Sequence, residues 1–135
     1  MKEDCIFCKI VDKEIPSKII YEDERVMGFL DIFPISEGHT VVIPKKHYES
    51  IESIESEALM DVIKIVKKLS SLILNKLNPE GLNIIQNNYE AAGQVVKHFH
   101  IHLIPRNKND EKIHVFTPEN QATEEELHKV LEILK

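Results

Sequence analysis

The sequence predicts a single α+β domain in which an antiparallel sheet packs against one long helix, and three observations support this prediction. The chain has 135 residues, 42% hydrophobic and 30% charged, which is typical of one globular domain. Short apolar or alternating segments separated by turn residues indicate strands. A single extended run of apolar residues at helical spacing indicates the helix. Strands before and after one helix favour the α+β class over a βαβ repeat.

The first half of the chain predicts three strands. Residues 19–21 and 26–30 read as two strands joined by the polar turn at 22–25. Residues 40–43, within GHTVVIPKKH, form the third, and Pro44 ends it because proline cannot donate a ladder hydrogen bond.

Residues 56–77 predict the long helix. We expect Ser56 to be the N-cap and Asn78-Pro79 to end the helix. Three apolar residues lie off the main stripe, which suggests contact with a partner, although a fully covered monomeric helix is the alternative. The stripe consists of Leu59, Val62, Ile63, Val66, Leu69, Ile73 and Leu77, and the off-stripe residues are Ile65, Leu72 and Leu74.

Two further strands and a terminal helix follow. Residues 81–87 and 98–104 read as strands. Thr123 with Glu126 three positions later forms a capping box that starts a short helix. Its apolar stripe must pack on the body or on a partner, and comprises Leu127, Val130, Leu131 and Leu134.

Composition and charge exclude several classes of function. The formal net charge of −6 argues against an electrostatic grip on a long nucleic acid, which needs a basic face. The N-terminus MKEDCIFCKI lacks an apolar run long enough for a signal peptide, and no stretch approaches the roughly 20 apolar residues of a membrane span. We therefore expect a soluble cytoplasmic protein.

Three histidines alternate with apolar residues in KHFHIHLIP. In a strand, His98, His100 and His102 would project from one face, while the residues between them would face the core. A solvated strand face is the alternative, but three imidazoles at regular alternation favour a functional site. Imidazole suits metal binding, proton transfer and nucleophilic attack alike. Just upstream, Gly93 permits close backbone approach to a ligand and Gln94 offers a neutral donor.

Both cysteines, Cys5 and Cys8, belong to one C-x-x-C motif. A redox pair would be expected between a strand and a helix, and residue 5 comes too early for a preceding strand. Metal binding is therefore favoured over redox chemistry or over two small hydrophobic side chains. A closed tetrahedral zinc site needs two more ligands, and spacing does not choose among the histidines at 39, 47, 98, 100, 102, 114 and 128.

These motifs together resemble the histidine triad (HIT) family, whose motif is His-φ-His-φ-His-φ-φ with φ apolar. The segment HFHIHLI matches it, and CIFCKIVDKEIPSKIIYEDERVMGFLDI, GHTVVIPKKH and GLNIIQNNYEAAGQ resemble the corresponding family segments in order and spacing. The resemblance covers residues 4–106 of a single domain spanning 1–135, with residues 107–135 as a C-terminal extension. Within the family, the chain is most similar to the Hint-like nucleotide-binding branch, in its bacterial and archaeal form with an N-terminal C-x-x-C.

The resemblance implies a two-fold dimer in which two sheets join into one. It also implies an enzyme that attacks the α-phosphorus of a nucleoside phosphate derivative. A nucleotidyl-histidine intermediate and release of a nucleoside monophosphate such as AMP would follow, with no catalytic metal. The middle histidine, His100, would be the nucleophile, with one ring nitrogen donating to a backbone carbonyl. The catalytic residues implied are His100, His102 and Gln94, and the nucleotide-binding residues are Phe29, Asp31, Ile32, Asn87, Gln94, His100 and His102.

The resemblance also implies that Cys5, Cys8, His47 and His98 bind a structural zinc ion, and that His39 lies beside the triad. His114 and His128 lie outside the motifs and read as surface residues. One departure concerns Val95, since the family usually has Ser or Thr there; losing that hydroxyl could cost about 1–3 kcal/mol of transition-state stabilisation. The alternatives are a dinucleoside polyphosphate hydrolase and a non-catalytic purine-nucleotide sensor, which Val95 favours.

Overall fold

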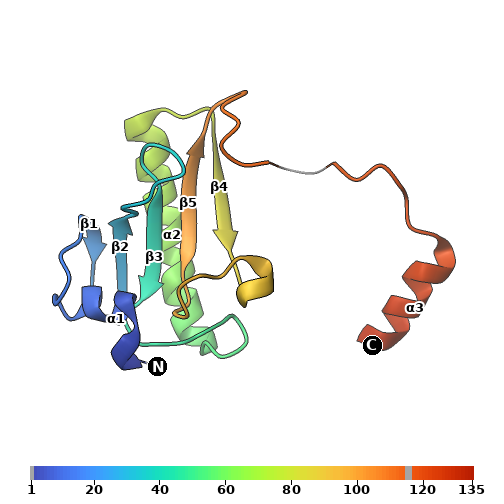
Figure 1. Cartoon of the computed structure of the whole chain (residues 1–135), viewed down its shortest axis with the longest axis horizontal. Coiled ribbons are helices and arrows are strands. Elements are labelled where there is room, and N and C mark those ends of the chain that lie inside the picture. Colours follow the sequence, from blue (N-terminus) through green and yellow to red (C-terminus); the bar gives the residue numbers. More distant parts are fainter. Residues whose placement is uncertain (1, 115–116) are drawn as a thin grey trace.

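The computed structural model describes residues 2–114 and 117–135, and its centre is a five-stranded antiparallel sheet. The long helix α2 covers one face, and the short helix α1 lies against the other (Figure 1). This arrangement confirms the predicted α+β class. In spatial order β1-β2-β3-β5-β4, the strands are β1 (Ile19–Glu22), β2 (Val26–Leu30), β3 (Thr40–Pro44), β5 (Ile101–Arg106) and β4 (Gly81–Gln86). The helices are α1 (Ile6–Val11), α2 (Ser56–Leu77) and α3 (Glu124–Leu134), with 3-10 turns η1 (Lys2–Asp4) and η2 (Glu90–Ala92).

Alternation along the central strands divides the core into two layers. In β3, Val42 belongs to the layer beneath α2, whereas Val41 and Ile43 belong to the layer beneath α1. Because both faces are covered, β3 is buried along its whole length, which explains its uninterrupted apolar sequence.

The helix α2 agrees with its predicted range but not with its predicted cap. Glu55 is the N-cap and Ser56 the first helical residue; the Glu55 carboxylate makes no cap hydrogen bond because it accepts from Lys46 and Tyr48 instead. Asn78 ends the helix in the left-handed region, with φ of 50°, as expected for a C-cap.

The apolar stripe of α2 is shifted from the prediction. The helix buries Val62, Ile65, Val66, Leu69 and Ile73. Ile65 therefore packs in the chain's own core, so it gives no reason to expect a partner. Leu72, Leu74 and Leu77 keep 40–45% of their surface exposed, and Ile63 keeps 49%.

The strand predicted over residues 98–104 begins later, because paired residues start at Ile101. Continuing the β3–β5 register would place Phe99 opposite Pro44, which has no N–H to donate. The Phe99 N–H donates instead to the carbonyl of Tyr48 at 2.6 Å. Phe99, Ile101 and Leu103 nevertheless share the core beneath α2, as the alternation predicts.

The C-terminal helix α3 begins with the predicted capping box, in which Thr123 and Glu126 exchange side-chain-to-backbone hydrogen bonds. All residues of α3 are exposed, and the helix stands apart from the sheet (Figure 1). Within the described residues, its apolar stripe therefore packs on no part of the body, and packing on a partner stays a prediction. None of the described helices combines the length and apolar character that crossing a bilayer requires.

Candidate active site and metal centre

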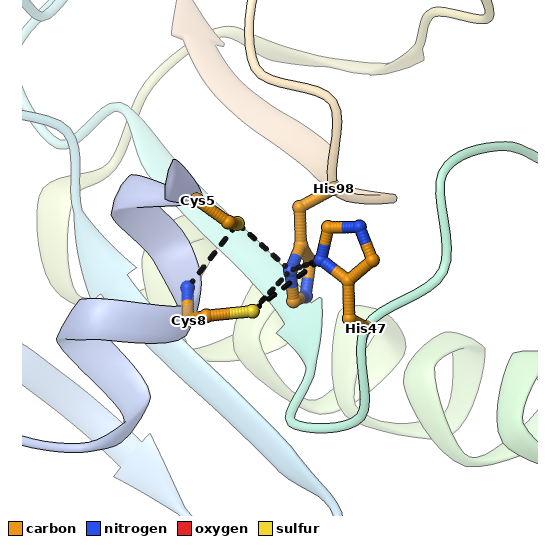
Figure 2. Close-up of side chains that lie close together, drawn as sticks. All are labelled: Cys5, Cys8, His47 and His98. Atoms are coloured by element: carbon orange, nitrogen blue, oxygen red, sulfur yellow. Dashed lines mark hydrogen bonds between the residues drawn. The ribbon is translucent and has the colours of Figure 1, made fainter. Parts of the chain in front are cut away.

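Four side chains from separate segments converge beside α1 (Figure 2). Cys5 is the N-cap of α1 and Cys8 lies within it, while His47 follows β3 and His98 precedes β5. Their ligand atoms all lie within 4.8 Å of one another. The structure thus brings together the four residues that the sequence resemblance assigned to a metal ion.

The short helix explains how the two thiols reach the same point. Cys5 Sγ accepts a hydrogen bond from the backbone N–H of Cys8 at 3.3 Å, so the C-x-x-C spacing places both cysteines on the first turn of α1. The thiolate is the form of cysteine that binds metal.

Four of the six distances among these ligand atoms fit a tetrahedral zinc ion. Zn–S bonds of about 2.3 Å and Zn–N bonds of about 2.0 Å imply ligand separations of about 3.3–3.8 Å. His98 Nδ1 lies 3.4 Å from Cys5 Sγ, 3.5 Å from Cys8 Sγ and 3.2 Å from His47 Nδ1. Cys8 Sγ lies 3.3 Å from His47 Nδ1.

The protonation of His98 also suits metal binding. Its Nε2 donates to the carbonyl of Pro44 at 2.8 Å, so Nδ1 keeps its lone pair for the cluster. Burial lowers the pKa of His98 to about 4, which keeps the ring neutral at neutral pH. This cluster can hold a metal ion, and its sulfur and nitrogen donors suit zinc.

A cavity of about 540 Å³ lies on the α1 side of the sheet. Its lining is mostly apolar but includes Asp31, His39, His100 and His102. The volume and the few convergent polar groups are typical of a small-molecule site. A wider groove of about 830 Å³ beside α2 contains none of these residues.

His100 presents one ring nitrogen to this cavity in a defined tautomer. Its Nδ1 donates to the carbonyl of His98 at 2.6 Å, which leaves Nε2 with a lone pair. The side chain is 4% exposed, and burial lowers the pKa of His100 below 6.5. The ring is therefore neutral at neutral pH, the state that a nucleophile or base requires.

His39 and His102 are joined by a hydrogen bond between their rings. The N–H of Ile35 donates to His39 Nδ1 at 3.0 Å, so a neutral His39 carries its proton on Nε2. That Nε2 lies 2.9 Å from His102 Nδ1, which accepts the proton's hydrogen bond. His102 then carries its own proton on Nε2, where it can donate to a ligand in the cavity.

Asp31, His39 and His102 also bring three ligand atoms within 4.8 Å of one another. A neutral His39 bound to metal through Nε2 would need a proton on Nδ1, where the Ile35 N–H already donates. The hydrogen bonds therefore fit a proton relay better than a second metal site. Asp31 Oδ2 lies 3.6 Å from His39 Nε2 and can orient it.

The predicted nucleotide-binding residues divide into two groups. Phe29, Asp31, Ile32 and Asn87 line the cavity together with His100 and His102. Gln94 is 5% exposed and is not among the lining residues. Its amide accepts the Tyr89 N–H and donates to the carbonyls of Glu49 and Val96, so in this structure Gln94 holds the segment before the triad in place.

Sequence reasoning missed the contribution of α1 to the cavity. Ile6, Phe7 and Ile10 all line it, and the Phe7 ring lies 5.1 Å from the His100 ring in an edge-on arrangement. The apolar residues flanking the C-x-x-C motif were the available signal, but their position depends on contacts about 90 residues away in the chain.

Comparisons with known proteins agree with this geometry. The family model for the HIT domain matches residues 12–109. An uncharacterised HIT-like protein of Methanocaldococcus jannaschii is 46% identical over 131 residues, covering 97% of this chain and 98% of the relative. The adenosine 5'-monophosphoramidase of Candida albicans is 40% identical over 135 residues, covering 97% and 89%.

Solved structures extend the similarity to the whole fold. A HIT family protein from Bacillus anthracis, 40% identical, matches with a TM-score of 0.90 over 98% of this chain and 95% of that protein. A zinc-bound histidine triad family protein from Mycobacterium smegmatis, 34% identical, matches with a TM-score of 0.78 over 88% of this chain and 86% of that protein.

Proposed function

The chain belongs to the HIT domain family, and from that premise we propose that it is a nucleotidyl hydrolase of the phosphoramidase type. It cleaves a nucleoside 5'-phosphoramidate or related nucleotidyl substrate at the α-phosphorus and releases a nucleoside monophosphate such as AMP. The family and the relative named as an adenosine 5'-monophosphoramidase support nucleotide hydrolysis in general.

One observation carries the proposal: the tautomer of His100. Donation from Nδ1 to the His98 carbonyl leaves the Nε2 lone pair available at the wall of the cavity. A neutral, oriented imidazole in an apolar cavity is the requirement for nucleophilic attack on phosphorus. His102, which the His39 relay leaves protonated on Nε2, supplies the adjacent donor.

The reaction then proceeds in two displacements. His100 Nε2 forms a bond to the α-phosphorus as the bond to the leaving nitrogen breaks; His102 Nε2 donates a hydrogen bond to the phosphoryl group, and the leaving nitrogen takes a proton from solvent. Water next attacks the phosphorus and gives its proton to solvent, and the bond to His100 breaks to release the monophosphate. Each step passes through a lower barrier than direct hydrolysis, as covalent catalysis requires.

The remaining cavity residues bind the nucleotide. Asp31 accepts hydrogen bonds from the ribose hydroxyls. Its carboxylate is held in place because Oδ1 accepts the Phe33 N–H at 2.8 Å and Oδ2 faces His39. Phe29 and Ile32 form part of the apolar wall for a purine, which α1 completes. Asn87 contacts the phosphate side of the ligand.

The cysteine–histidine cluster holds a structural zinc ion in this proposal. Its four protein ligands complete a tetrahedral shell and leave no position for a catalytic water. The bound ion would fix α1, and with it one wall of the cavity, to the segments that carry His47 and His98.

We further propose that residues 1–135 form one domain with its family-like core at 4–106, that it works in the cytoplasm, and that it is a homodimer. Part of the exposed apolar surface of α2 and the edge strand β4 favour joining two sheets: Met60, Ile63, Leu74, Leu77 and Ile84 are each 41–70% exposed. A dinucleoside polyphosphate hydrolase and a nucleotide sensor remain the alternatives, the second because Val95 lacks a hydroxyl.

The test is the release of AMP from an adenosine phosphoramidate by the wild type and by His100→Asn. Asparagine can still donate to the His98 carbonyl but offers no nucleophile, so turnover is expected to disappear while AMP binding and melting temperature persist. His128→Asn, which changes an exposed histidine on α3, is the matched control and is expected to keep full activity. An inactive wild type that still binds AMP would favour the sensor.

A further inference from the structure

We propose that Tyr89 is a positioning residue for the cavity: its backbone conformation begins the turn that fixes the side chain of Asn87, a residue of the lining. Tyr89 itself is not among the lining residues, so it acts through others. This inference rests on the proposed function and adds to it a residue on which nucleotide binding depends. Three features support it: the conformation of Tyr89, the contacts that hold this conformation, and the packing of Gly93 beside Asn87.

The backbone of Tyr89 adopts a conformation that is normally reserved for glycine. Tyr89 is the N-cap of η2, with φ of 72° and ψ of 159°. In this region of φ and ψ a Cβ atom crowds the backbone, so residues other than glycine occupy it only where their surroundings hold them there. Strained residues of this kind cluster at ligand clamps and active sites. The contacts of Tyr89 must therefore offset its strain.

Hydrogen bonds from both the backbone and the side chain hold Tyr89 in this conformation. Its N–H donates to Oε1 of Gln94 at 2.7 Å, and its carbonyl accepts the backbone N–H groups of Ala92 and Gln94, each at 3.1 Å. Its phenol hydroxyl donates to Oγ of Ser50 at 3.3 Å. Ser50 is buried, in the loop that follows the metal-cluster residue His47. The backbone bonds close the turn, and the phenol ties it to a fixed part of the core.

The Gln94 side chain is itself fixed, so it is a firm acceptor for Tyr89. Its Nε2 donates to the carbonyl of Glu49 at 2.7 Å and to the carbonyl of Val96 at 3.1 Å. Because these two bonds use both hydrogens of the amide nitrogen, the amide oxygen must point toward the Tyr89 N–H. The buried amide thus determines where the turn begins.

The turn that begins at Tyr89 ends beside the cavity at Gly93. Gly93 is the C-cap of η2, with φ of 94°, and its N–H donates to the carbonyl of Glu90 at 2.9 Å. Gly93 and Asn87 both line the cavity and lie next to each other. A Cβ atom at Gly93 would stand 3.6 Å from Nδ2 of Asn87, so the Asn87 amide lies over the face of the glycine. A shift of the turn would therefore move the surface against which this amide packs.

The Asn87 side chain depends on that surface. Within the part of the chain that the structure describes, its amide makes no hydrogen bond to protein, whereas its backbone carbonyl accepts Nε2 of Gln86 at 3.1 Å. The amide is therefore available to a ligand, but packing alone sets its direction. No lysine or arginine is among the described lining residues, so a bound phosphate would rely on neutral donors such as this one. Their value depends on being placed in advance.

The experiment compares three substitutions of Tyr89. Tyr89→Phe removes the hydroxyl that bonds Ser50 but keeps the ring and the backbone strain. Tyr89→Ala removes the ring as well and still keeps the strain. Tyr89→Gly loses the same side-chain contacts as the alanine variant, but glycine adopts this conformation without strain. The alanine and glycine variants are therefore a matched pair that differs in whether the backbone can hold the turn.

We would measure the Kd for AMP, kcat/KM for an adenosine phosphoramidate, and hydrogen exchange of the amides of residues 90–94. Tyr89→Ala is expected to weaken AMP binding and to lower kcat/KM by about tenfold or more, with faster exchange in the turn. Tyr89→Gly is expected to stay within about twofold of wild type in both constants, with slow exchange in the turn. Tyr89→Phe should fall between the two. Tyr48→Phe, which removes a phenol hydrogen bond to Glu55 in the adjoining loop, is the control and should change none of these values.

A double variant tests whether Tyr89 acts through Asn87. In an Asn87→Ala background, Tyr89→Ala is expected to change the Kd for AMP by less than about twofold, because the amide that the turn positions is gone. A full tenfold effect in that background would overturn the assignment. Equal weakening of AMP binding by Tyr89→Ala and Tyr89→Gly would overturn it as well, since loss of side-chain packing would then account for both.

The readouts separate this inference from the hydrolase itself. If the wild type releases no AMP from the phosphoramidate, the hydrolase proposal fails, while the order of Kd values still decides the role of Tyr89. If Tyr89→Ala proves unfolded in melting experiments, the glycine and phenylalanine variants decide it, because the glycine variant must bind AMP more tightly than the phenylalanine variant. The reverse order would refute the positioning role and leave the hydrolase standing.

Discussion

Removing the proposed metal ligand Cys8 is expected to release α1 from the sheet and weaken nucleotide binding, without unfolding the domain. Helix α1 has six residues, far fewer than the roughly 12–15 that an isolated helix needs for marginal stability. It therefore depends on its tertiary contacts. Because Ile6, Phe7 and Ile10 line the cavity, the position of α1 decides whether the proposed purine wall exists.

The magnitude can be worked from the buried groups of α1. Phe7 and Ile10 are 9% and 7% exposed, and burying two such side chains contributes about 3–6 kcal/mol. Ordering the backbone of six residues costs about 6–12 kcal/mol. Burial alone leaves a deficit of a few kcal/mol, and a metal ion present at about 1,000 times its Kd offsets about 4 kcal/mol of it.

The assay is hydrogen exchange of the zinc-loaded wild type and of Cys8→Ala, combined with the Kd for AMP. In the variant, amides of residues 6–11 should lose protection while those of β3 and β5 keep it, and AMP binding should weaken by about tenfold or more. Lys9→Ala, a change in the same helix that removes no ligand, is the matched control and should retain metal, protection and affinity. Full protection of α1 and wild-type AMP affinity in metal-free Cys8→Ala would refute the reasoning.

Two further predictions concern pH and packing. Hydrolysis should stay constant from neutral pH to below 6.5, because burial lowers the pKa of the nucleophile His100; a pH profile of kcat checks this, and an acid limb above 6.5 would contradict it. Burial also lowers the pKa of His102 to about 4, so between pH 6.5 and about 4 the unfolded chain binds more protons than the folded chain. The free energy of unfolding, measured by urea titration, should therefore fall as pH drops through that window. Phe99→Ala should lower the free energy of unfolding by about 3–5 kcal/mol because Phe99 is 0% exposed. Phe33→Ala should change it by less than about 0.5 kcal/mol because Phe33 is 83% exposed. Equal effects of the two variants in urea denaturation would contradict this packing.

Local pattern was sufficient for the elements that bury one continuous face. The range of α2 follows from its apolar spacing and from Asn78, whose left-handed conformation ends the helix. The side-chain alternation around the triad placed Phe99 in the core, where it lies beneath α2, although the strand itself begins at Ile101. In both cases the burying contacts repeat with the period of the element, so the sequence carries the information.

Features that depend on a distant partner could not be predicted in this way. The late start of β5 depends on Pro44, which lies in the neighbouring strand and cannot donate to it. The N-cap of α2 depends on Lys46 and Tyr48, which occupy the carboxylate of Glu55. The short helix α1 carries too few residues for a periodic signal. Its contacts come from β2 and β3, and Phe7 also contacts the rings of His98 and His100.

His98 links the metal centre to the proposed nucleophile through a single residue. Its ring nitrogen Nδ1 faces the two sulfurs, while its carbonyl accepts the Nδ1 proton of His100 and so fixes which nitrogen faces the cavity. The carbonyl can hold that position only if the ring fixes the backbone. The ring contacts Cys5, Cys8 and His47 on one side and donates to the Pro44 carbonyl on the other. A structural ion would therefore act on catalysis by two routes, one through the α1 wall that contacts the purine and one through the tautomer of His100. Of the three histidines in the motif, the first would thus be needed for activity although it lies outside the cavity lining.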